Sequence, residues 1–349
     1  MTEGADDLPG LDLQGLQRFL ADATPGLLNG PLSAELIVGG KSNLTYIVTD
    51  GAREVVVRRP PLGHVLATAH DMTREHRVMA ALADTPVPVP RMYAACTDTD
   101  VIGAPFYVME RVAGTPFRTA DELNPLGQQR IRTIADAVTD TLVALHDVDP
   151  AAVGLGDFGR PDGYLERQVH RWRRQMQDSK SRELAGEEEL HQRLASAIPA
   201  SSGATIVHGD YRMDNTLIDD SDRVAAVLDW EMATLGDPLA DVALMLVYQA
   251  LADVAPGAVS TVSRATGHPT RAEIVQRYSE RSGRDVSHLA FHEALAYYKL
   301  AAILEGIYFR HQHGQTVGAG FEDIGASTEP LFAAGLAVMQ HYTSGSKGE

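Results

Sequence analysis

Two aspartates and one asparagine in a short part of the chain are the residues best suited to chemistry. Residues 208–215 read HGDYRMDN, and residues 228–231 read LDWE. An aspartate within hydrogen-bond reach of an alcohol can orient the hydroxyl and take its proton, whereas an asparagine carbonyl and a second carboxylate are hard oxygen ligands that suit Mg²⁺. The spacing therefore predicts phosphoryl transfer to an alcohol, with Asp210 as the catalytic residue and with Asn215 and Asp229 as metal ligands.

The same residues allow two plainer interpretations. Asp, Asn and Gly often do no more than mark turns. A metal-dependent hydrolase could use His208, Asp210 and Asp214, but it would need more histidine ligands than this stretch supplies. The 13 histidines show no His-Glu-x-x-His or comparable spacing. We expect His208 to be a hydrogen-bonded core residue, and Glu231 either to contact the metal ion or to pack beside Trp230.

A small antiparallel sheet is predicted in the first third of the chain. After a helical pattern at 11–23, short β-branched runs are broken by glycines, and an Asp-Gly pair at 50–51 indicates a hairpin. The strands are expected at 34–38, 44–48, 53–58, 91–95 and 105–112, with one helix at 69–83. This order describes a sheet with one helix against it.

The remainder of the chain is predicted to be mostly helical. Helices are expected at 127–146, 162–177, 186–198, 239–252, 271–282, 288–313 and 327–343. Short strands interrupt them at 205–229, where the candidate site lies. We therefore expect an α+β protein with two lobes: residues 1–112 form a sheet lobe, and residues 113–349 form a helical lobe with the catalytic loop and the acceptor site.

Composition limits the partners and the compartment. The 349 residues carry a net charge of −17, which argues against nucleic acid or an anionic membrane as the main partner. Cys96 is the single cysteine, the acidic N-terminus does not resemble a signal peptide, and the longest apolar run, residues 242–248, is too short to span a membrane. These features predict a cytoplasmic protein with a small-molecule substrate.

The strings HGDYRMDNTLI and VLDWEMATLGDPLADVA resemble the aminoglycoside phosphotransferase and choline kinase-like family over about residues 30–320. This resemblance implies a two-lobed protein-kinase-like fold, ATP and Mg²⁺ as cofactors, and transfer to the hydroxyl of a small molecule. The strings GGKSNLTY, VVVRRPP and GYLERQVHRW look most like the kinase-like domain fused to some acyl-CoA dehydrogenases. The 349 residues contain no dehydrogenase part, so we expect a free-standing version of that domain.

The resemblance also implies which residues bind the nucleotide. Ser42 and Asn43 belong to a turn whose backbone N–H groups would contact the ATP phosphates, although a plain hairpin would look the same. Arg58 stands where the family usually has a phosphate-binding lysine, and the neighbouring Arg59 could take that place instead. Arginine binds phosphate with a fork rather than a point charge. Glu75 would be the helix partner of this cation.

Three further residues take their expected roles from the resemblance. Glu110 and Val112 follow a strand and would form the hinge whose backbone binds the adenine edge. Asp241 would brace the catalytic loop without contacting substrate.

One predicted helix is basic, and its charge bears on the chemical class of the acceptor. Arg167, His170, Arg171 and Arg174 have the spacing of a single helical face in an otherwise acidic chain. This face would attract an anionic acceptor such as a hydroxyacyl-CoA or a hydroxy acid, or it is a solvated face balanced by nearby glutamates. Two other readings stay open: an aminoglycoside-type antibiotic phosphotransferase, and a catalytically silent nucleotide-binding protein. Glu305 in the helix at 288–313 is an unusual residue to bury.

Overall fold

The computed structural model describes residues 8–37, 43–62, 71–254, 260–314 and 324–345. The chain forms two compact units, which we describe separately. The N-terminal unit comprises residues 1–114 together with 225–233, and the helical unit comprises residues 115–224 together with 234–349. The chain passes between them three times, and the second passage lies inside strand β8 (Val224–Val227). Residues 225–233, which the sequence groups with the helical lobe, thus pack with the N-terminal unit.

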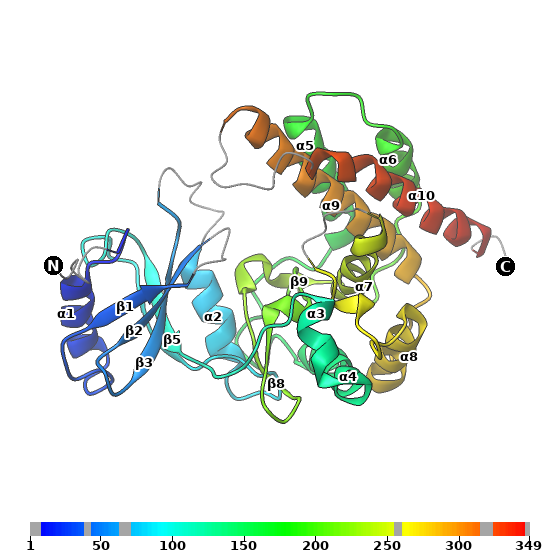
Figure 1. Cartoon of the computed structure of the whole chain (residues 1–349). Coiled ribbons are helices and arrows are strands. Elements are labelled where there is room, and N and C mark those ends of the chain that lie inside the picture. Colours follow the sequence, from blue (N-terminus) through cyan, green and yellow to red (C-terminus); the bar gives the residue numbers. More distant parts are fainter. Residues whose placement is uncertain (1–7, 38–42, 63–70, 255–259, 315–323, 346–349) are drawn as a thin grey trace. The chain divides into compact units, whose positions relative to one another are not determined.

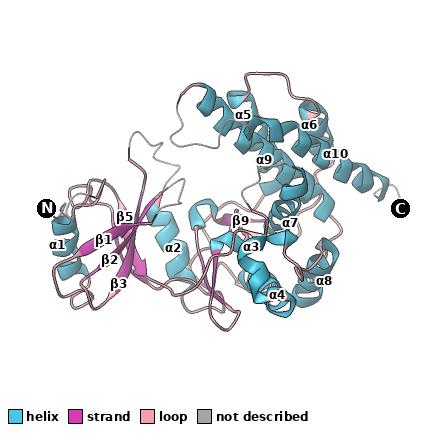
Figure 2. Ribbon diagram, viewed as in Figure 1, coloured by secondary structure: helices cyan, strands magenta, loops and turns pink. Residues whose placement is uncertain are grey.

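The N-terminal unit contains a five-stranded antiparallel sheet (Figures 1 and 2). The strands in spatial order are β1 (Ser33–Leu36), β2 (Leu44–Thr49), β3 (Glu54–Arg59), β5 (Phe106–Glu110) and β4 (Met92–Cys96). Two helices, α1 (Leu13–Ala23) and α2 (Met72–Leu82), accompany the sheet. The predicted strands and helices are confirmed, and their ends differ from the predicted ones by only a few residues.

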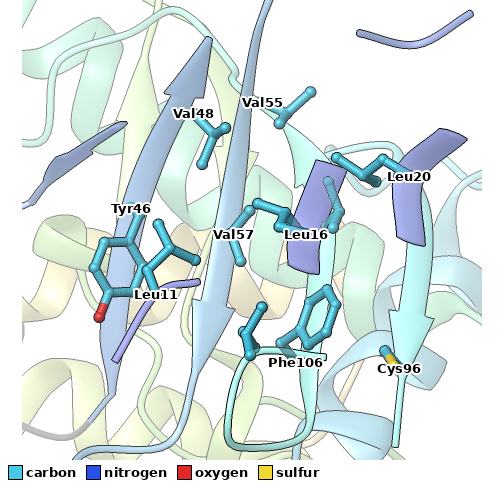
Figure 3. Close-up of a cluster of buried hydrophobic side chains, with 11 residues drawn as sticks. Leu11, Leu16, Leu20, Tyr46, Val48, Val55, Val57, Cys96 and Phe106 are labelled. Atoms are coloured by element: carbon cyan, nitrogen blue, oxygen red, sulfur yellow. The ribbon is translucent and has the colours of Figure 1, made fainter. Parts of the chain in front are cut away.

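Alternation along the strands gives the sheet two different faces. One face packs against α1, as Figure 3 shows, in a cluster of buried apolar side chains: Leu11, Leu16, Leu20, Tyr46, Val48, Val55, Val57, Cys96, Ile102, Phe106 and Val108. The opposite face carries the alternate residues, including Arg58 and Tyr107, which are paired in the β3–β5 register. Helix α2 packs on β4 and β5, and its Glu75 is bonded to Tyr107.

The helical unit is built around α9 (Leu289–Gln312), which contacts α5, α6, α7 and α10. Because α9 is apolar on nearly all sides, it can be buried among these neighbours. The other helices are α3 (Ala120–Leu123), α4 (Gln128–Asp147), α5 (Tyr164–Ser179), α6 (Glu187–Ser196), α7 (Leu239–Val254), α8 (Arg271–Ser282) and α10 (Thr328–Gly345). Helix α4 packs against α8. All seven predicted helices are confirmed, whereas the short α3 was not predicted.

Short strands hold the candidate catalytic loop in the helical unit. Strand β6 (Thr205–Val207) precedes the loop and pairs antiparallel with β9 (Thr234–Gly236). Strand β7 (Thr216–Ile218) follows the loop, and Ile218 exchanges backbone hydrogen bonds with Thr115 at 2.9 and 3.0 Å. Residues 208–215 are therefore anchored at both ends. In the described ranges, no helix has the length and apolar character needed to cross a membrane.

Candidate active site

The guanidinium of Arg58 lies between two carboxylates of the N-terminal unit. Its Nε is 3.4 Å from Glu75 Oε2, and its Nη2 donates to Asp229 Oδ1. The side chains of Arg58 and Glu75 are 12% and 1% exposed. Burial opposes the charge on Arg58, but Tyr107, Glu75 and Asp229 together outweigh it, so the pKa of the guanidinium lies above its usual value. The structure brings Arg58 and Glu75 into contact and adds Asp229 to the pair.

Arg59 points to the other face of the sheet, because successive residues of a strand alternate. Its Nη1 donates to the carbonyl oxygens of Gly10 and, at 3.0 Å, of Ile102. These contacts fasten the segment before α1 to the loop before β5. Arg59 is thus occupied by backbone carbonyls, and Arg58 is the arginine that faces the carboxylates.

Glu75 is the centre of a buried hydrogen-bond network. Tyr107 donates its hydroxyl to Glu75 Oε2 at 2.9 Å, and Asn43 Nδ2 donates to Glu75 Oε1 at 3.2 Å. The same nitrogen lies 3.3 Å from Glu231 Oε2. Burial raises the pKa of the Glu75 carboxyl, and Arg58 and the two donors act in the opposite direction. Tyr107 was not predicted, although its place opposite Arg58 in the sheet would have indicated it.

Asp229 has an unusual backbone conformation for a residue other than glycine. Its φ is 67°, in the left-handed region, at the turn between β8 and the short 3₁₀ helix Trp230–Met232. Such a conformation costs about 1–3 kcal/mol and persists where the surroundings impose it, often at functional sites. The turn aims the Asp229 carboxylate at Arg58 and buries the Trp230 ring, whose Nε1 donates to Val227 O at 3.0 Å.

Three further residues were predicted to bind the nucleotide, and the structure describes two of them. Ser42 lies outside the described residues. Glu110 ends β5, where its backbone N–H donates to Arg91 O at 2.8 Å and its Oε2 accepts from the Arg91 N–H at 3.2 Å. Val112 follows two residues later and is half-buried.

In the helical unit, a buried aspartate holds the first residues of the catalytic loop. Asp241 on α7 accepts the backbone N–H groups of His208 at 2.6 Å and Gly209 at 2.7 Å. His146 Nε2 lies 3.4 Å from the same carboxylate, and its Nδ1 is 2.8 Å from the Tyr278 hydroxyl. Burial would raise the pKa of Asp241, but these partners outweigh it and lower the pKa. The carboxylate therefore stays ionised and fixes the loop backbone.

Asp210 and Asn215, the two predicted residues of this loop, are in direct contact. Asn215 Nδ2 donates to the backbone oxygen of Asp210 at 2.9 Å and to its Oδ2 at 3.0 Å. The amide nitrogen is thereby used, which leaves the amide oxygen of Asn215 as the atom for a metal ion. His208 is fully buried, and its Nδ1 accepts the Asp210 N–H at 3.2 Å, as expected of a core histidine.

Two cations that were not predicted lie beside this loop. Arg212 Nη1 is 2.7 Å from Asp214 Oδ2, Arg212 Nε is 3.5 Å from Asp210 Oδ2, and its guanidinium lies 4.8 Å from the centre of the Tyr248 ring. Lys299 Nζ donates to Gly209 O at 2.6 Å. Arg212 is part of the motif itself, whereas the sequence signal for Lys299 is a charged residue between two apolar runs of its helix.

The basic residues of α5 are used in different ways. Arg167 donates to the carbonyl oxygens of Arg160 and Asp162, so it holds the turn before the helix. His170, Arg171 and Arg174 are exposed. Only part of the predicted basic face thus remains for a ligand.

Glu305 has a structural partner. Its carboxylate accepts from Arg182 at 3.1 and 2.8 Å and from the Thr328 hydroxyl at 3.1 Å. This pairing explains how α9 buries a glutamate.

The donor atoms fit a magnesium ion. Within the described residues, no group of three or more His, Cys, Asp or Glu side chains is placed to hold a metal ion alone. Mg²⁺ usually takes one or two protein oxygens and fills its shell with water and phosphate. The amide oxygen of Asn215 in the helical unit and the carboxylate of Asp229 in the N-terminal unit are each of a type that suits Mg²⁺.

Comparisons with known proteins place the chain in a family. Residues 33–286 match the model of the phosphotransferase enzyme family. The chain is 34% identical to acyl-CoA dehydrogenase family member 10 of Mus musculus over 325 residues, which cover 90% of this chain and 30% of that protein. It is 33% identical to family member 11 of Gallus gallus over 353 residues, covering 96% and 45%. The chain thus spans less than half the length of these relatives.

Solved structures agree with this placement. A putative aminoglycoside phosphotransferase from Ralstonia eutropha JMP134 is 34% identical, with a TM-score of 0.83 over 95% of this chain and 99% of that one. Choline kinase from Cryptosporidium parvum Iowa II, at 14% identity, shares the fold with a TM-score of 0.63 over 96% and 97%. The predicted kinase-like α+β fold is confirmed. The chain belongs to the phosphotransferase enzyme family.

Proposed function

We propose that the protein transfers the γ-phosphate of ATP, with Mg²⁺, to a hydroxyl of a small anionic molecule, such as a hydroxy acid or a hydroxyacyl-CoA. The observation that carries this proposal is the contact between Asp210 and Asn215 on a loop fixed by Asp241. The Asn215 amide keeps the Asp210 carboxylate in one orientation. Asp210 can then accept a hydrogen bond from the acceptor hydroxyl and take its proton as the new O–P bond to the acceptor forms and the O–P bond to the departing ADP breaks.

The metal ion would be held by Asn215 and Asp229. When bound there, Mg²⁺ would offset the negative charge of the phosphates. Asn215 offers its amide oxygen, since its nitrogen is bonded to Asp210. Asp229 offers the carboxylate oxygen that Arg58 does not contact.

Arg58 would bind the phosphates, and Glu75 would orient it. Ser42 and Asn43 are proposed to contact the phosphates through their backbone, and Glu110 and Val112 to bind the adenine edge. These four assignments rest on the family resemblance. The buried Glu75 network supports the role of Arg58, because it fixes a guanidinium that would otherwise be flexible.

An anionic acceptor is supported by the charges of the helical unit. Arg171 and Arg174 on α5 are exposed, and Lys299 adjoins the catalytic loop. Cationic acceptors such as aminoglycosides would be repelled by these groups. The same acidic, single-cysteine composition supports a cytoplasmic protein without a nucleic-acid partner.

A screen for transfer of one phosphate tests the proposal. Hydroxy acids, hydroxyacyl-CoAs, amino alcohols and aminoglycosides are incubated with ATP and Mg²⁺, and products are detected by mass spectrometry. We expect product from an anionic acceptor, no product with Asp210→Ala, and unchanged ATP binding by that variant in calorimetry. Asp220→Ala, an exposed aspartate of the next hairpin, is the matched control and should retain activity. Full activity of Asp210→Ala would refute the catalytic assignment, and product from aminoglycosides alone would refute the anionic acceptor.

A catalytically silent nucleotide-binding protein is the second candidate. The ion pair of Arg58 with Asp229 favours it, because this pair occupies a proposed metal ligand. That candidate predicts thermal stabilisation by ATP with no consumption of ATP in the presence of any acceptor.

A further inference from the structure

A cavity of the helical unit adjoins the catalytic loop. It lies among α5, α7, α9 and the end of β6. Its lining includes Tyr164, Trp172, Leu244, His292, Leu295 and Lys299, together with Gly209 of the loop. The cavity thus reaches the residue that directly precedes Asp210.

Lys299 is the cation of this cavity. Its Nζ donates to Gly209 O at 2.6 Å and lies 5.4 Å from the centre of the Trp172 ring. An ammonium has three N–H donors, and over the described ranges Gly209 O is the one acceptor bonded to it. Burial lowers the pKa of Lys299, and the nearby Asp210 and Asp241 counteract this shift. A donor-rich ammonium in a partly enclosed space is a binding group for an anion.

A second cation lies beside the Trp172 indole ring. The guanidinium of Arg171 lies 5.2 Å from the centre of the Trp172 ring and is exposed, whereas Trp172 is buried. Two cations beside one ring make this part of the unit unfavourable for an ammonium ligand and favourable for a negative group.

The remaining lining is mixed: Gln168, His292 and Asp241 are polar, and the Asp241 carboxylate accepts the backbone N–H groups of His208 and Gly209, whereas the other lining side chains are apolar or aromatic. Leu244 and Leu295, with Val207 and Ala296, line it next to Lys299. A ligand that satisfies both kinds of wall carries an aliphatic chain and an anionic end. A polycation would leave its charges facing Lys299 and its amines against apolar side chains.

We propose that this Lys299 cavity is an acceptor subsite that binds the carboxylate end of an aliphatic hydroxy acid, with Lys299 as the specificity-determining residue. The inference rests on the proposed function, because it assigns the acceptor class for that reaction. The carbonyl oxygen that Lys299 contacts belongs to Gly209, which directly precedes Asp210. A ligand carboxylate bonded to Lys299 would therefore lie near the residue proposed to orient the acceptor hydroxyl. Lys299 would then select acceptors by charge, and Asp210 would act on their alcohol.

Binding of small probes by the whole chain tests the subsite without requiring turnover. Butanoate, butanamide and butylamine share a four-carbon chain but differ in charge, and inorganic phosphate represents the other source of an anion. Ligand-observed NMR should show binding of butanoate, with much weaker binding of the amide and the amine. Lys299→Met should weaken butanoate binding roughly tenfold or more, the effect of losing one charge-assisted hydrogen bond.

Matched variants keep the result interpretable. Lys299→Arg retains the charge and should retain butanoate binding, while Arg281→Met removes an exposed cation of α8 and should change little. Far-UV circular dichroism verifies that Lys299→Met is folded, and if it is not, loss of binding at high salt together with retention in Lys299→Arg carries the test. Equal binding of butanamide or butylamine, no butanoate binding, or butanoate binding unaffected in Lys299→Met would overturn the proposal. Phosphate binding as tight as that of butanoate would overturn the choice of a carboxylate.

The outcome separates this inference from the proposed function. Phosphate transfer without Lys299-dependent butanoate binding removes the subsite and leaves the kinase reaction standing. Lys299-dependent binding without transfer to any acceptor keeps the subsite and removes the proposed reaction.

Discussion

Replacing Arg58 by methionine tests whether the buried carboxylate network of the N-terminal unit depends on that cation. The substitution keeps an apolar chain of similar length but removes the guanidinium. Among the described residues, Glu75, which is 1% exposed, then keeps the Tyr107 hydroxyl at 2.9 Å and the Asn43 amide at 3.2 Å as donors. Asp229 loses its ion pair as well.

The expected cost follows from this burial. Removing one partner of a buried ion pair destabilises a protein by about 3–5 kcal/mol, because the other charge stays buried without compensation. Tyr107 and Asn43 continue to stabilise the Glu75 carboxylate, so we expect Arg58→Met to cost about 3 kcal/mol of unfolding free energy. Glu75→Gln leaves Arg58 paired with Asp229 and should cost about 1–2 kcal/mol.

Urea denaturation followed by circular dichroism measures these values, and the double variant decides the interpretation. If the two side chains act as a pair, the double variant should lose about 2 kcal/mol less unfolding free energy than the two single variants lose together. Arg111→Met is the control on the same sheet: its partner Glu54 and Arg111 itself are 47% and 42% exposed, so less than about 1 kcal/mol should be lost. Single effects that add to within about 0.5 kcal/mol would refute a coupled pair.

Two further predictions concern the fold. Burial raises the pKa of Asp237, but His292 and backbone N–H groups outweigh it and lower the pKa to about 2, below the ordinary 3.8. The carboxylate therefore stabilises the fold above about pH 4, and about 2 kcal/mol of unfolding free energy is lost as the pH falls toward 2. Asp237→Asn should reduce this loss when denaturation is measured as a function of pH. An unchanged loss would contradict the assignment. A Cβ on Gly15 would lie 2.0 Å from Val101 O, whereas the nearest atom to a Cβ on Gly156 is 3.8 Å away. Gly15→Ala should therefore lose about 1–3 kcal/mol of stability in thermal melting, and Gly156→Ala almost none. Equal losses would contradict this packing.

Local patterns predicted the elements of this chain better than its short non-local pairings. Periodicity located α4 and α9 to within one residue at each end, because long amphipathic or apolar stretches give a strong signal. Strand β9 was missed, since three residues carry little pattern and its partner β6 lies far back in the sequence. The placement of residues 225–233 in the N-terminal unit was missed for the same reason: Val227 donates its N–H to Pro88 O at 2.8 Å, a contact over a long sequence separation.

The candidate site divides in the same way. Asp210 and Asn215 are five positions apart in one motif that the sequence singled out, and the structure shows them in contact. Lys299 is 90 positions from Gly209, so only the packing of α9 beside the loop reveals it. Alternation along β3 would have separated Arg58 from Arg59, had the sequence shown which face of the sheet α1 covers.

Arginine at position 58 has a physical consequence that bears on the silent alternative. A guanidinium presents its donors on different edges of a rigid plane. Nε faces Glu75 and Nη2 faces Asp229, and within the described residues no partner contacts Nη1. Arg58 can therefore keep its hold on Glu75 while it offers a further N–H group to a phosphate oxygen. The usual lysine would have one nitrogen for the same partners. The exchange of lysine for arginine thus preserves a cation fit to bind phosphate, and it gives no reason by itself to expect an inactive protein.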